Sequence, residues 1–313
     1  GTAAALLIGV VMAWGLSWPI MKVGLEYVSP LTFACIRNVV AATAMGCISF
    51  AAGQARLPSR GDWPLVLSVG AVQIAGFLGL ITVALQFVPA GRSAILAFTT
   101  PIWVVPLALF VLKEPLGVLR SMGFVLGIGG VAVMFNPAGF DWHDSDVLIG
   151  NGLLLFAALL WAFLILQIRL HKWSGSPLSL APWQMGFGAL LLGLSIPILE
   201  PEPYLHPEPV FFGVLAYAGL VASAFGVWAS VVVTRALPAI TVSLGMLASP
   251  VVSVVTSVAF FGERLTATNL GGLLLISGGL AAIALAERRG RSATPARAGT
   301  AGPAALGVRQ AGD

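Results

Sequence analysis

Residues 89–116 read P-A-G-R-S-A-I-L-A-F-T-T-P-I-W-V-V-P-L-A-L-F-V-L-K-E-P-L, and the chain repeats the pattern 149 positions later. The matched pairs are Pro89/Pro238, Ala90/Ala239, Pro101/Pro250, Glu114/Glu263 and Leu116/Leu265. Each copy is an apolar segment broken by proline, followed by a turn with one glutamate and by a glycine-rich apolar segment. An internal repeat of this kind predicts two related halves that pack around a shared axis.

The composition indicates a membrane protein. The chain is 58% hydrophobic and 9% charged, whereas an ordinary soluble domain is about 45–50% apolar and about 25% charged. Apolar runs recur along nearly the whole sequence, and each is long enough to cross a hydrocarbon core, which takes about 20 helical residues. The pattern predicts helical spans, since a β-barrel would show short alternating strands.

We expect ten spans joined by short linkers. They are Ala3–Tyr27, Leu31–Ala51, Trp63–Phe87, Ala90–Leu112, Leu116–Phe135, Val147–Leu170, Leu180–Leu199, Val210–Leu237, Ala239–Gly262 and Thr266–Ala286. Residues 1–137 would form a first five-helix repeat and residues 138–286 a second. Residues 287–313 are rich in Ala, Gly, Pro and Arg, which predicts a disordered tail.

Basic residues indicate the orientation of the spans. If the N-terminus is cytoplasmic, the inner loops and the tail hold most of the cations: Arg56, Arg60, Lys113, Arg120, Arg169, Lys172, Arg235, Arg288, Arg289, Arg291, Arg297 and Arg309. The outer side holds Lys22, Arg92 and Arg264. Because cytoplasmic loops of membrane proteins carry an excess of Lys and Arg, both termini are predicted to be cytoplasmic.

The first spans of the two halves also match, at an offset of 147. The matched pairs are Trp14/Trp161, Ser29/Ser176 and Pro30/Pro177. Because five is an odd number of spans, the second half is inverted across the membrane. Inverted repeats are typical of transporters whose site lies at the midplane between the halves. We therefore predict an all-α integral membrane fold with ten transmembrane helices, in two inverted five-helix repeats around a central cavity; duplicated channels and membrane scaffolds are the alternative.

These motifs resemble the EamA-domain repeats of the drug/metabolite transporter superfamily. The resemblance is carried by Ser29-Pro30 with Arg37, by Thr100-Pro101 to Glu114-Pro115-Leu116, and by Ser249-Pro250 to Glu263-Arg264-Leu265. It covers about Leu6 to Ala286 and implies ten helices, two inverted repeats and transport of small metabolites, usually export. Within the family, the chain is most similar to the bacterial aromatic amino acid exporters. Gln184 stands where the repeat would place a second Arg37, so the halves need not bind substrate symmetrically.

Several tryptophans lie inside spans, where an interfacial belt does not explain them. They are Trp14, Trp18, Trp103, Trp161 and Trp228. Trp14 and Trp18 are four residues apart and share one helix face. A buried indole N–H needs a partner, and a wet cavity supplies one. We predict that these rings line a cavity and stack on a planar substrate; ordinary helix packing is the alternative.

Arg37 is the charge that lies deepest in a span. Such a side chain is costly unless it faces a cavity or a partner. It would clamp a substrate carboxylate, or it would anchor the helix by bonding helix-end carbonyls or by snorkelling outward. The sequence favours the anchor, and Asn38 beside it fits either role.

Other polar and aromatic residues are weaker candidates for substrate contact. Gln73 and Phe77 are one turn apart in the third span and would face the cavity together. Ser243 lies in the ninth span, where serines more often bond across helices or to their own backbone.

Prolines and glutamates mark structural points in the repeated segment. Pro101, Pro106 and Pro250 free backbone carbonyls inside spans, and we predict that they are hinges. Glu114 and Glu263 follow the fourth and ninth spans and are expected to accept N–H groups at the start of the next helix.

Several signatures are missing from the sequence. It contains no G-x-x-x-x-G-K-[ST] segment for ATP, and its histidines fall in loops, away from any cluster of metal ligands. No span has a central Asp or Glu, the usual relay for protons or sodium ions. We therefore predict no cofactor and no metal, and we expect a facilitator that moves its substrate down a gradient.

Together these features predict a bacterial inner-membrane exporter of amino acids, aromatic ones preferred, that works by alternating access. Its partners would be the small-molecule substrate and the lipid bilayer, without nucleic acid, and a monomer would suffice. An exporter of other amphipathic metabolites or drugs is the alternative within the class. An intramembrane enzyme would need paired catalytic side chains near a span end, which the sequence lacks, and a structural subunit would not require inward-facing tryptophans.

Overall fold

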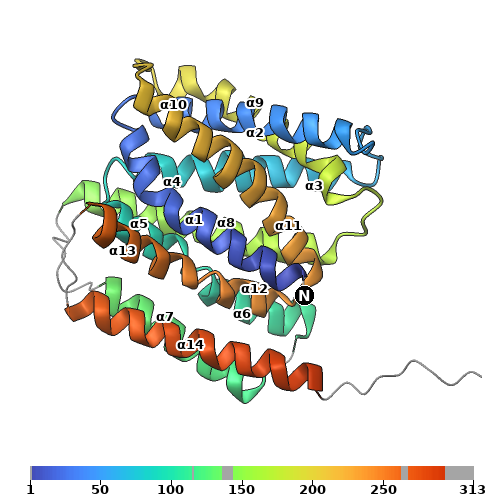
Figure 1. The fold of residues 1–313 in the computed structure, drawn as a ribbon, viewed down its shortest axis with the longest axis vertical. Coiled ribbons are helices and arrows are strands. Elements are labelled where there is room, and N and C mark those ends of the chain that lie inside the picture. The colour runs from blue at the N-terminus through green and yellow to red at the C-terminus, as the bar shows by residue number, and fades with distance from the viewer. Residues whose placement is uncertain (1, 115, 136–143, 262–266, 293–313) are drawn as a thin grey trace, which may run out of the picture.

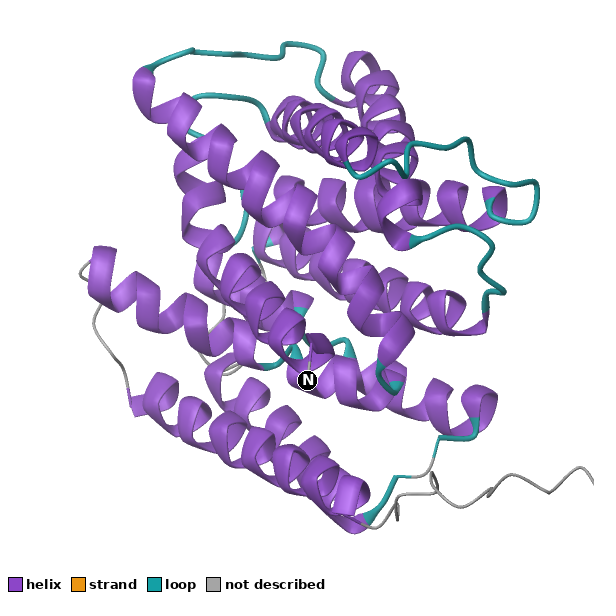
Figure 2. Cartoon of the chain, turned by 45° about the vertical axis from the view of Figure 1, so that its right-hand side comes forward, coloured by secondary structure: helices purple, strands orange, loops and turns teal. Residues whose placement is uncertain are grey.

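The computed structural model describes residues 2–114, 116–135, 144–261 and 267–292. These residues form helices joined by short loops (Figure 2), with one isolated bridge between Val28 and Leu205. The predicted all-helical membrane class is confirmed. Eight helical stretches are long and apolar enough to cross a membrane: Thr2–Gly24, Pro30–Ala51, Trp63–Ala84, Ala90–Leu112, Ser145–Leu170, Pro177–Leu199, Pro209–Ala236 and Ala239–Thr256.

The fifth and tenth predicted spans are shorter than the others. They correspond to the apolar stretches Val118–Val133 and Leu270–Ala286, within α7 (Val118–Phe135) and α14 (Ala267–Ser292). The predicted tail also needs a correction, because α14 continues through residues 287–292, where Glu and Arg are good helix formers. Residues 293–313 lie outside the described part of the chain.

Two helix pairs form opposite edges of the bundle (Figure 1). Helix α2 (Pro30–Ala51) packs on α9 (Pro177–Leu199) at one edge, and α7 packs on α14 at the other. The helices between them bring the two halves together at the centre: α1 (Thr2–Gly24) contacts α13 (Ala248–Phe261), and α8 (Ser145–Leu170) contacts α5 (Ala90–Ala97) and α6 (Pro101–Leu107).

The third and eighth spans each contain a π-helical segment that the sequence did not predict. In the third, η1 (Val69–Leu78) lies between α3 (Trp63–Ser68) and α4 (Gly79–Ala84). In the eighth, η4 (Tyr217–Phe225) lies between α10 (Pro209–Ala216) and α11 (Gly226–Ala236). The two segments occupy matching positions of the repeat. A π-helix is rare and often marks a functional site.

The fourth and ninth spans are broken next to the predicted hinges. Helix α5 ends at Ala97 and α6 begins at Pro101, while α12 (Ala239–Gly245) is separated from α13, which holds Pro250. Pro106 lies in α6 just before η2 (Ala108–Leu112). The breaks therefore coincide with the prolines, and movement at them stays a prediction.

Glycines allow α7 and α14 to pack closely and in opposite directions. A Cβ atom added to Gly123 would lie 3.0 Å from the carbonyl oxygen of Gly279, and one added to Gly130 would lie 2.8 Å from that of Gly272. The residue numbers of these contacts rise along α7 while they fall along α14, so the two helices are antiparallel. Small residues let membrane helices approach in this way.

Carboxylates cap helix starts across the repeat. Glu114 accepts the N–H groups of Ala239 at 2.9 Å and Ile240 at 3.2 Å, so it caps α12. The sequence instead predicts a cap on the next helix in the chain, which is α7. The reason is that the end of the fourth span lies beside the start of the ninth. Glu200 accepts from the N–H groups of Leu31 and Thr32 at the start of α2. Glu263 lies outside the described residues.

Asp62 joins two loops on one face of the bundle. The carboxylate is 1% exposed and accepts the N–H groups of Ser174 at 3.0 Å and Gly175 at 2.8 Å and the hydroxyl of Ser59 at 2.9 Å, with His171 Nε2 at 3.3 Å. Burial raises the pKa of the Asp62 carboxyl, but these hydrogen bonds outweigh burial and hold the pKa below its ordinary value.

We predict that Gly130→Ala destabilises the protein and that the neighbouring Gly129→Ala does not. The added methyl group at Gly130 meets backbone at 2.8 Å, whereas nothing lies within 4 Å of a Cβ atom at Gly129. Overpacking costs about 1–3 kcal/mol, so thermal unfolding of the purified protein should begin at a lower temperature for Gly130→Ala alone. Equal unfolding temperatures for the two variants would contradict the close packing of α7 on α14.

We also predict that Asp62→Asn lowers the unfolding temperature at pH 7 and that the difference from wild type disappears in acid. A carboxyl whose pKa is depressed in the folded state contributes stability above its unfolded pKa, about 3.9, and loses it as the pH falls through the folded pKa. Unfolding scans between pH 7 and pH 3 measure this difference. A difference that grows toward low pH would show that the Asp62 carboxylate does not stabilise the fold.

Candidate functional site

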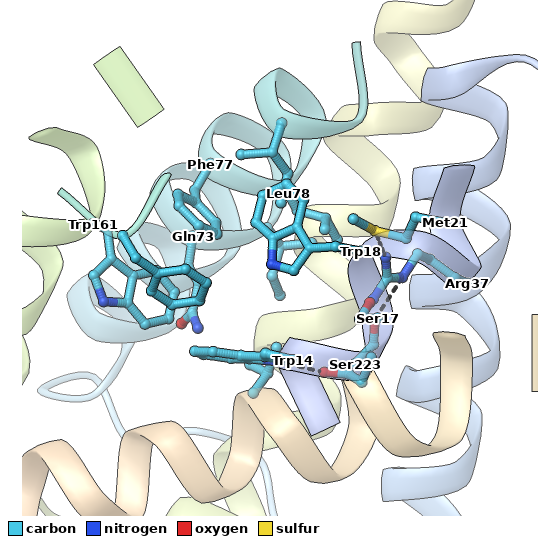
Figure 3. A pocket seen from close by; sticks show the side chains of 15 residues that line it. Trp14, Ser17, Trp18, Met21, Arg37, Gln73, Phe77, Leu78, Trp161 and Ser223 are labelled. Carbon is cyan, nitrogen blue, oxygen red and sulfur yellow. Dashed lines mark hydrogen bonds between the residues drawn. The ribbon is translucent and has the colours of Figure 1, made fainter. Parts of the chain in front are cut away.

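A cavity lies at the centre of the molecule, between helices of both halves (Figure 3). Its lining residues are Trp14, Ser17, Trp18, Met21, Arg37, Gln73, Ile74, Phe77, Leu78, Ile81, Phe98, Trp161, Ala222, Ser223 and Val227. The space among them is about 490 Å³ with its opening, of which about 50 Å³ is available to the centres of water molecules. A water needs about 10–15 Å³ by that measure, so the cavity holds a few waters and a larger ligand requires its walls to part.

Aromatic rings from both halves meet in this cavity. Trp14 and Trp161, a matched pair of the repeat, lie edge to face with ring centroids 5.1 Å apart. Phe77 contacts Trp161 at 4.9 Å, and Trp18 contacts Phe98 at 6.2 Å. These separations are those of favourable aromatic pairs. The rings are therefore core packing and cavity wall at once.

The π-helical segment η4 holds Trp14 in place. The indole N–H of Trp14 donates to the carbonyl oxygen of Ala222 at 2.9 Å, which satisfies a polar group that would be costly in an apolar interior. Gly226 makes this approach possible, because a Cβ atom there would lie 2.5 Å from the indole nitrogen. The matching residue in the first half is Phe77, which covers Trp161 instead. The two halves therefore present different surfaces to the cavity.

Arg37 is buried in the cavity wall with neutral partners. The residue is 2% exposed. Its Nε donates a hydrogen bond to the hydroxyl of Ser223 at 2.9 Å, and one of its amino nitrogens lies 2.8 Å from the sulfur of Met21. The central carbon of the guanidinium lies 5.8 Å from the ring centre of Phe33. Arg37 is buried rather than snorkelling outward, and its hydrogen bond goes to a hydroxyl on η4, so it joins two helices. Its interpretation as a structural anchor and its interpretation as a carboxylate clamp both stay predictions. No carboxylate pairs with Arg37 among the described residues.

Gln73 also faces the cavity and is 2% exposed. Its amide nitrogen donates to the hydroxyl of Ser230 at 3.3 Å. Its carbonyl oxygen has no partner within the described part of the chain. A buried acceptor without a partner costs about 1–3 kcal/mol, so a hydrogen bond donated to this oxygen when the cavity walls part would be favourable.

Four of the predicted contact residues do not line the cavity. Asn38 donates to the carbonyl of Ala34 at 2.8 Å, and Ser243 donates to that of Ile240 at 3.1 Å, so both bond to their own helices. The remaining two are Trp103 and Trp228.

These two tryptophans point away for different reasons. Trp103 is 37% exposed on α6, where the buried positions belong to Val104 and Val105. Trp228 follows the π-helical turn, which shifts the register so that Val227 faces the cavity. The structure thus brings together six of the ten predicted residues: Trp14, Trp18, Arg37, Gln73, Phe77 and Trp161.

Sequence reasoning missed other lining residues. Ser223 and Met21 contact Arg37, and Phe98 contacts Trp18. A serine, a methionine and a phenylalanine in apolar spans are too common to single out. The partner of Arg37 depends on the π-helical segment, which leaves no clear mark in the sequence. Within the described residues no group of His, Cys, Asp or Glu side chains could hold a metal ion.

Comparison with known families gives a match along both halves of the chain. The model of the EamA-like transporter family matches residues 1–136 and 148–285. A crystal structure of a protein only 19% identical has the same fold, with a TM-score of 0.73 over 92% of this chain and 98% of that one.

Two curated bacterial proteins are similar over most of their length. The uncharacterized transporter YvbV of Bacillus subtilis (strain 168) is 29% identical over 273 residues, which are 87% of this chain and 88% of that protein. The probable amino-acid metabolite efflux pump of Salmonella typhimurium (strain LT2) is 28% identical over 286 residues, 87% of this chain and 91% of that protein.

Proposed function

The chain belongs to the EamA-like transporter family, and from that premise we propose that it exports amino acids, aromatic ones preferred, across the bacterial inner membrane. One observation carries the proposal: a buried guanidinium with neutral partners lies in the wall of a cavity lined by aromatic rings. A charge inside a membrane protein requires an opposite charge or a polar cavity. The carboxylate of an amino acid supplies that charge at Arg37, and the rings receive its side chain.

The similarity to a probable amino-acid metabolite efflux pump supports the same substrate class. An exporter of other amphipathic metabolites or drugs is the alternative, and the aromatic walls would suit it too. Arg37 favours substrates that carry a carboxylate, because a guanidinium binds that group through charge-assisted hydrogen bonds.

The packing supports two inverted five-helix repeats with ten spans. A Cβ atom at Gly70 would lie 2.9 Å from the carbonyl oxygen of Gln184, and one at Gly219 would lie 3.3 Å from that of Arg37. Gly70 matches Gly219 in the repeat, and Arg37 matches Gln184, so the two contacts are equivalent. Such reciprocal contacts are expected of two units related by a two-fold axis. The antiparallel course of α7 and α14, which are also matching helices, supports the inversion of the halves.

The orientation follows from the charges. The start of α1 and the end of α14 lie at the same end of the bundle (Figure 1), which supports both termini being on one side. The excess of Lys and Arg in the loops of that side favours the cytoplasm. Residues 1–137 and 138–286 are then the two repeats of an inner-membrane protein.

Alternating access follows from the central cavity and the broken spans. Phe98 lies in the break between α5 and α6 and contacts Trp18 in the cavity wall. Bending at Pro101, and at Pro250 in the matching break, would move this wall and widen the cavity toward one face at a time. No Asp or Glu lines the cavity among the described residues, which supports facilitated diffusion and a non-enzymatic role.

We predict that Arg37→Gln raises the half-saturating concentration of phenylalanine in proteoliposomes at least about tenfold. A hydrogen bond to a charged group contributes about 1.5–3 kcal/mol, and about 1.4 kcal/mol is tenfold. Arg60→Gln, at an exposed loop residue away from the cavity, should leave transport unchanged. Phenethylamine lacks the carboxylate. In the wild type it should compete with labelled phenylalanine as weakly as unlabelled phenylalanine does in the Arg37→Gln variant. Unchanged transport by Arg37→Gln would refute the proposed site.

We further predict that an imposed pH or sodium gradient does not drive phenylalanine above its equilibrium concentration in the same vesicles. The reason is that the described cavity residues include no carboxylate to bind a proton or sodium ion. Exchange of labelled for unlabelled phenylalanine should proceed without any gradient. Uphill accumulation under either gradient would show that transport is ion-coupled.

A further inference from the structure

We infer that the cavity recognises its substrate at two ends, with Arg37 binding the carboxylate and the carbonyl oxygen of Gln73 accepting a hydrogen bond from a phenol hydroxyl at the far end of the substrate ring. The inference rests on the proposed function, because it assigns the ring substituent of the aromatic carboxylate that Arg37 binds. It makes Gln73 the residue that distinguishes tyrosine-like substrates from phenylalanine-like ones.

The orientation of the Gln73 amide is fixed by its neighbours. Ser230 donates its hydroxyl proton to the carbonyl of Val227 at 2.8 Å. The hydroxyl oxygen of Ser230 therefore accepts, and the group of Gln73 at 3.3 Å must be the amide nitrogen. The oxygen and the nitrogen of a side-chain amide are assigned from the hydrogen bonds that they make. The carbonyl oxygen of Gln73 is left as an acceptor at the cavity, buried and without a partner among the described residues.

Arg37 and Gln73 lie at different ends of the group of labelled side chains in Figure 3. In Figure 3 the guanidinium of Arg37 and the amide of Gln73 lie on opposite sides of Trp14 and Trp18. An α-amino acid carries its ammonium and carboxylate on one carbon atom, so the ammonium stays near Arg37. The far end of the substrate ring is the part that reaches Gln73.

The surface between the two polar ends suits an aromatic ring. Trp14 and Trp18 lie there as labelled in Figure 3, with Phe77 beside Gln73, and these rings offer apolar faces and edges to a planar group. A ring held between them directs a para substituent away from Arg37. A site built to hydrogen-bond a substrate hydroxyl discriminates strongly against the analogue that lacks it, because the buried acceptor is then unpaired.

The ammonium group has no carboxylate to bind. None of the described residues that line the cavity is Asp or Glu. The deaminated pair 3-(4-hydroxyphenyl)propionate and 3-phenylpropionate should therefore show the same preference for the hydroxyl as tyrosine and phenylalanine. Both pairs differ in one hydroxyl group alone, which isolates the contact at Gln73.

The test is competition with labelled phenylalanine in proteoliposomes of wild type, Gln73→Met and Gln184→Met. Gln73→Met keeps the length of the side chain and removes the acceptor. Gln184 is a matched control, because it is also buried, at 1% exposure, and does not line the cavity. In the wild type, each hydroxylated compound should compete about three- to tenfold more strongly than its partner, the range expected for one hydrogen bond.

In Gln73→Met this ratio should fall to about one, whatever the affinity for phenylalanine, and in Gln184→Met the ratio should persist. Elution as a single species in gel filtration reports that each variant is folded; if Gln73→Met does not elute so, Gln73→Leu is measured in its place against the same expectation. A ratio of one in the wild type, or a ratio that survives the loss of the Gln73 amide, overturns the inference and leaves the proposed function intact. If phenylalanine itself is not transported, the proposed function fails with it.

Discussion

The burial of one positive charge among neutral groups is the constraint on which this structure depends. The guanidinium of Arg37 is removed from water and held by a hydroxyl, a thioether and an aromatic ring. These groups solvate the cation without neutralising it, and a buried charge without its counter-charge is costly. The surrounding helices must therefore be held firmly to keep such an arrangement. Under the proposed function, this cation would attract a substrate anion and release it when the cavity opens to water.

The two halves of the chain match in sequence, but the residues that they contribute to the cavity differ. Phe77 and Gly226 are matching residues, as are Arg37 and Gln184, and as are Ile74 and Ser223. The members of each pair differ in size, polarity or charge: glycine stands opposite a large ring, glutamine opposite a cation, and serine opposite an apolar side chain. The two copies thus differ at each of three positions that shape the cavity: Arg37, its partner Ser223, and Gly226, which leaves space for Trp14. The repeat therefore sets the framework around the cavity, and the differences between its copies set which side chains line it.

The sequence was sufficient for features that repeat or that depend on composition. Hydropathy predicted the helices, and the offset between copies identified Trp14 and Trp161 as a matched pair, whose rings lie edge to face in the structure. It was insufficient where the helical register changes. The π-helical segments decide that Val227 rather than Trp228 faces the cavity, and that Ser223 reaches Arg37. Such a change costs little energy and depends on packing by distant helices, so a local pattern does not record it. Glu114 was assigned the right kind of bond but the wrong helix, because the partner in space is 125 residues away.

The carboxylate caps have a consequence for how the two halves depend on each other. Glu114 of the first half serves the start of α12 in the second, Glu200 of the second half serves the start of α2 in the first, and Asp62 bonds to loop residues beyond the middle of the chain. Each half thus has a helix start that is completed by a carboxylate of the other half. Separating the halves would therefore leave the N–H groups at the starts of α2 and α12 without their partners at the same time.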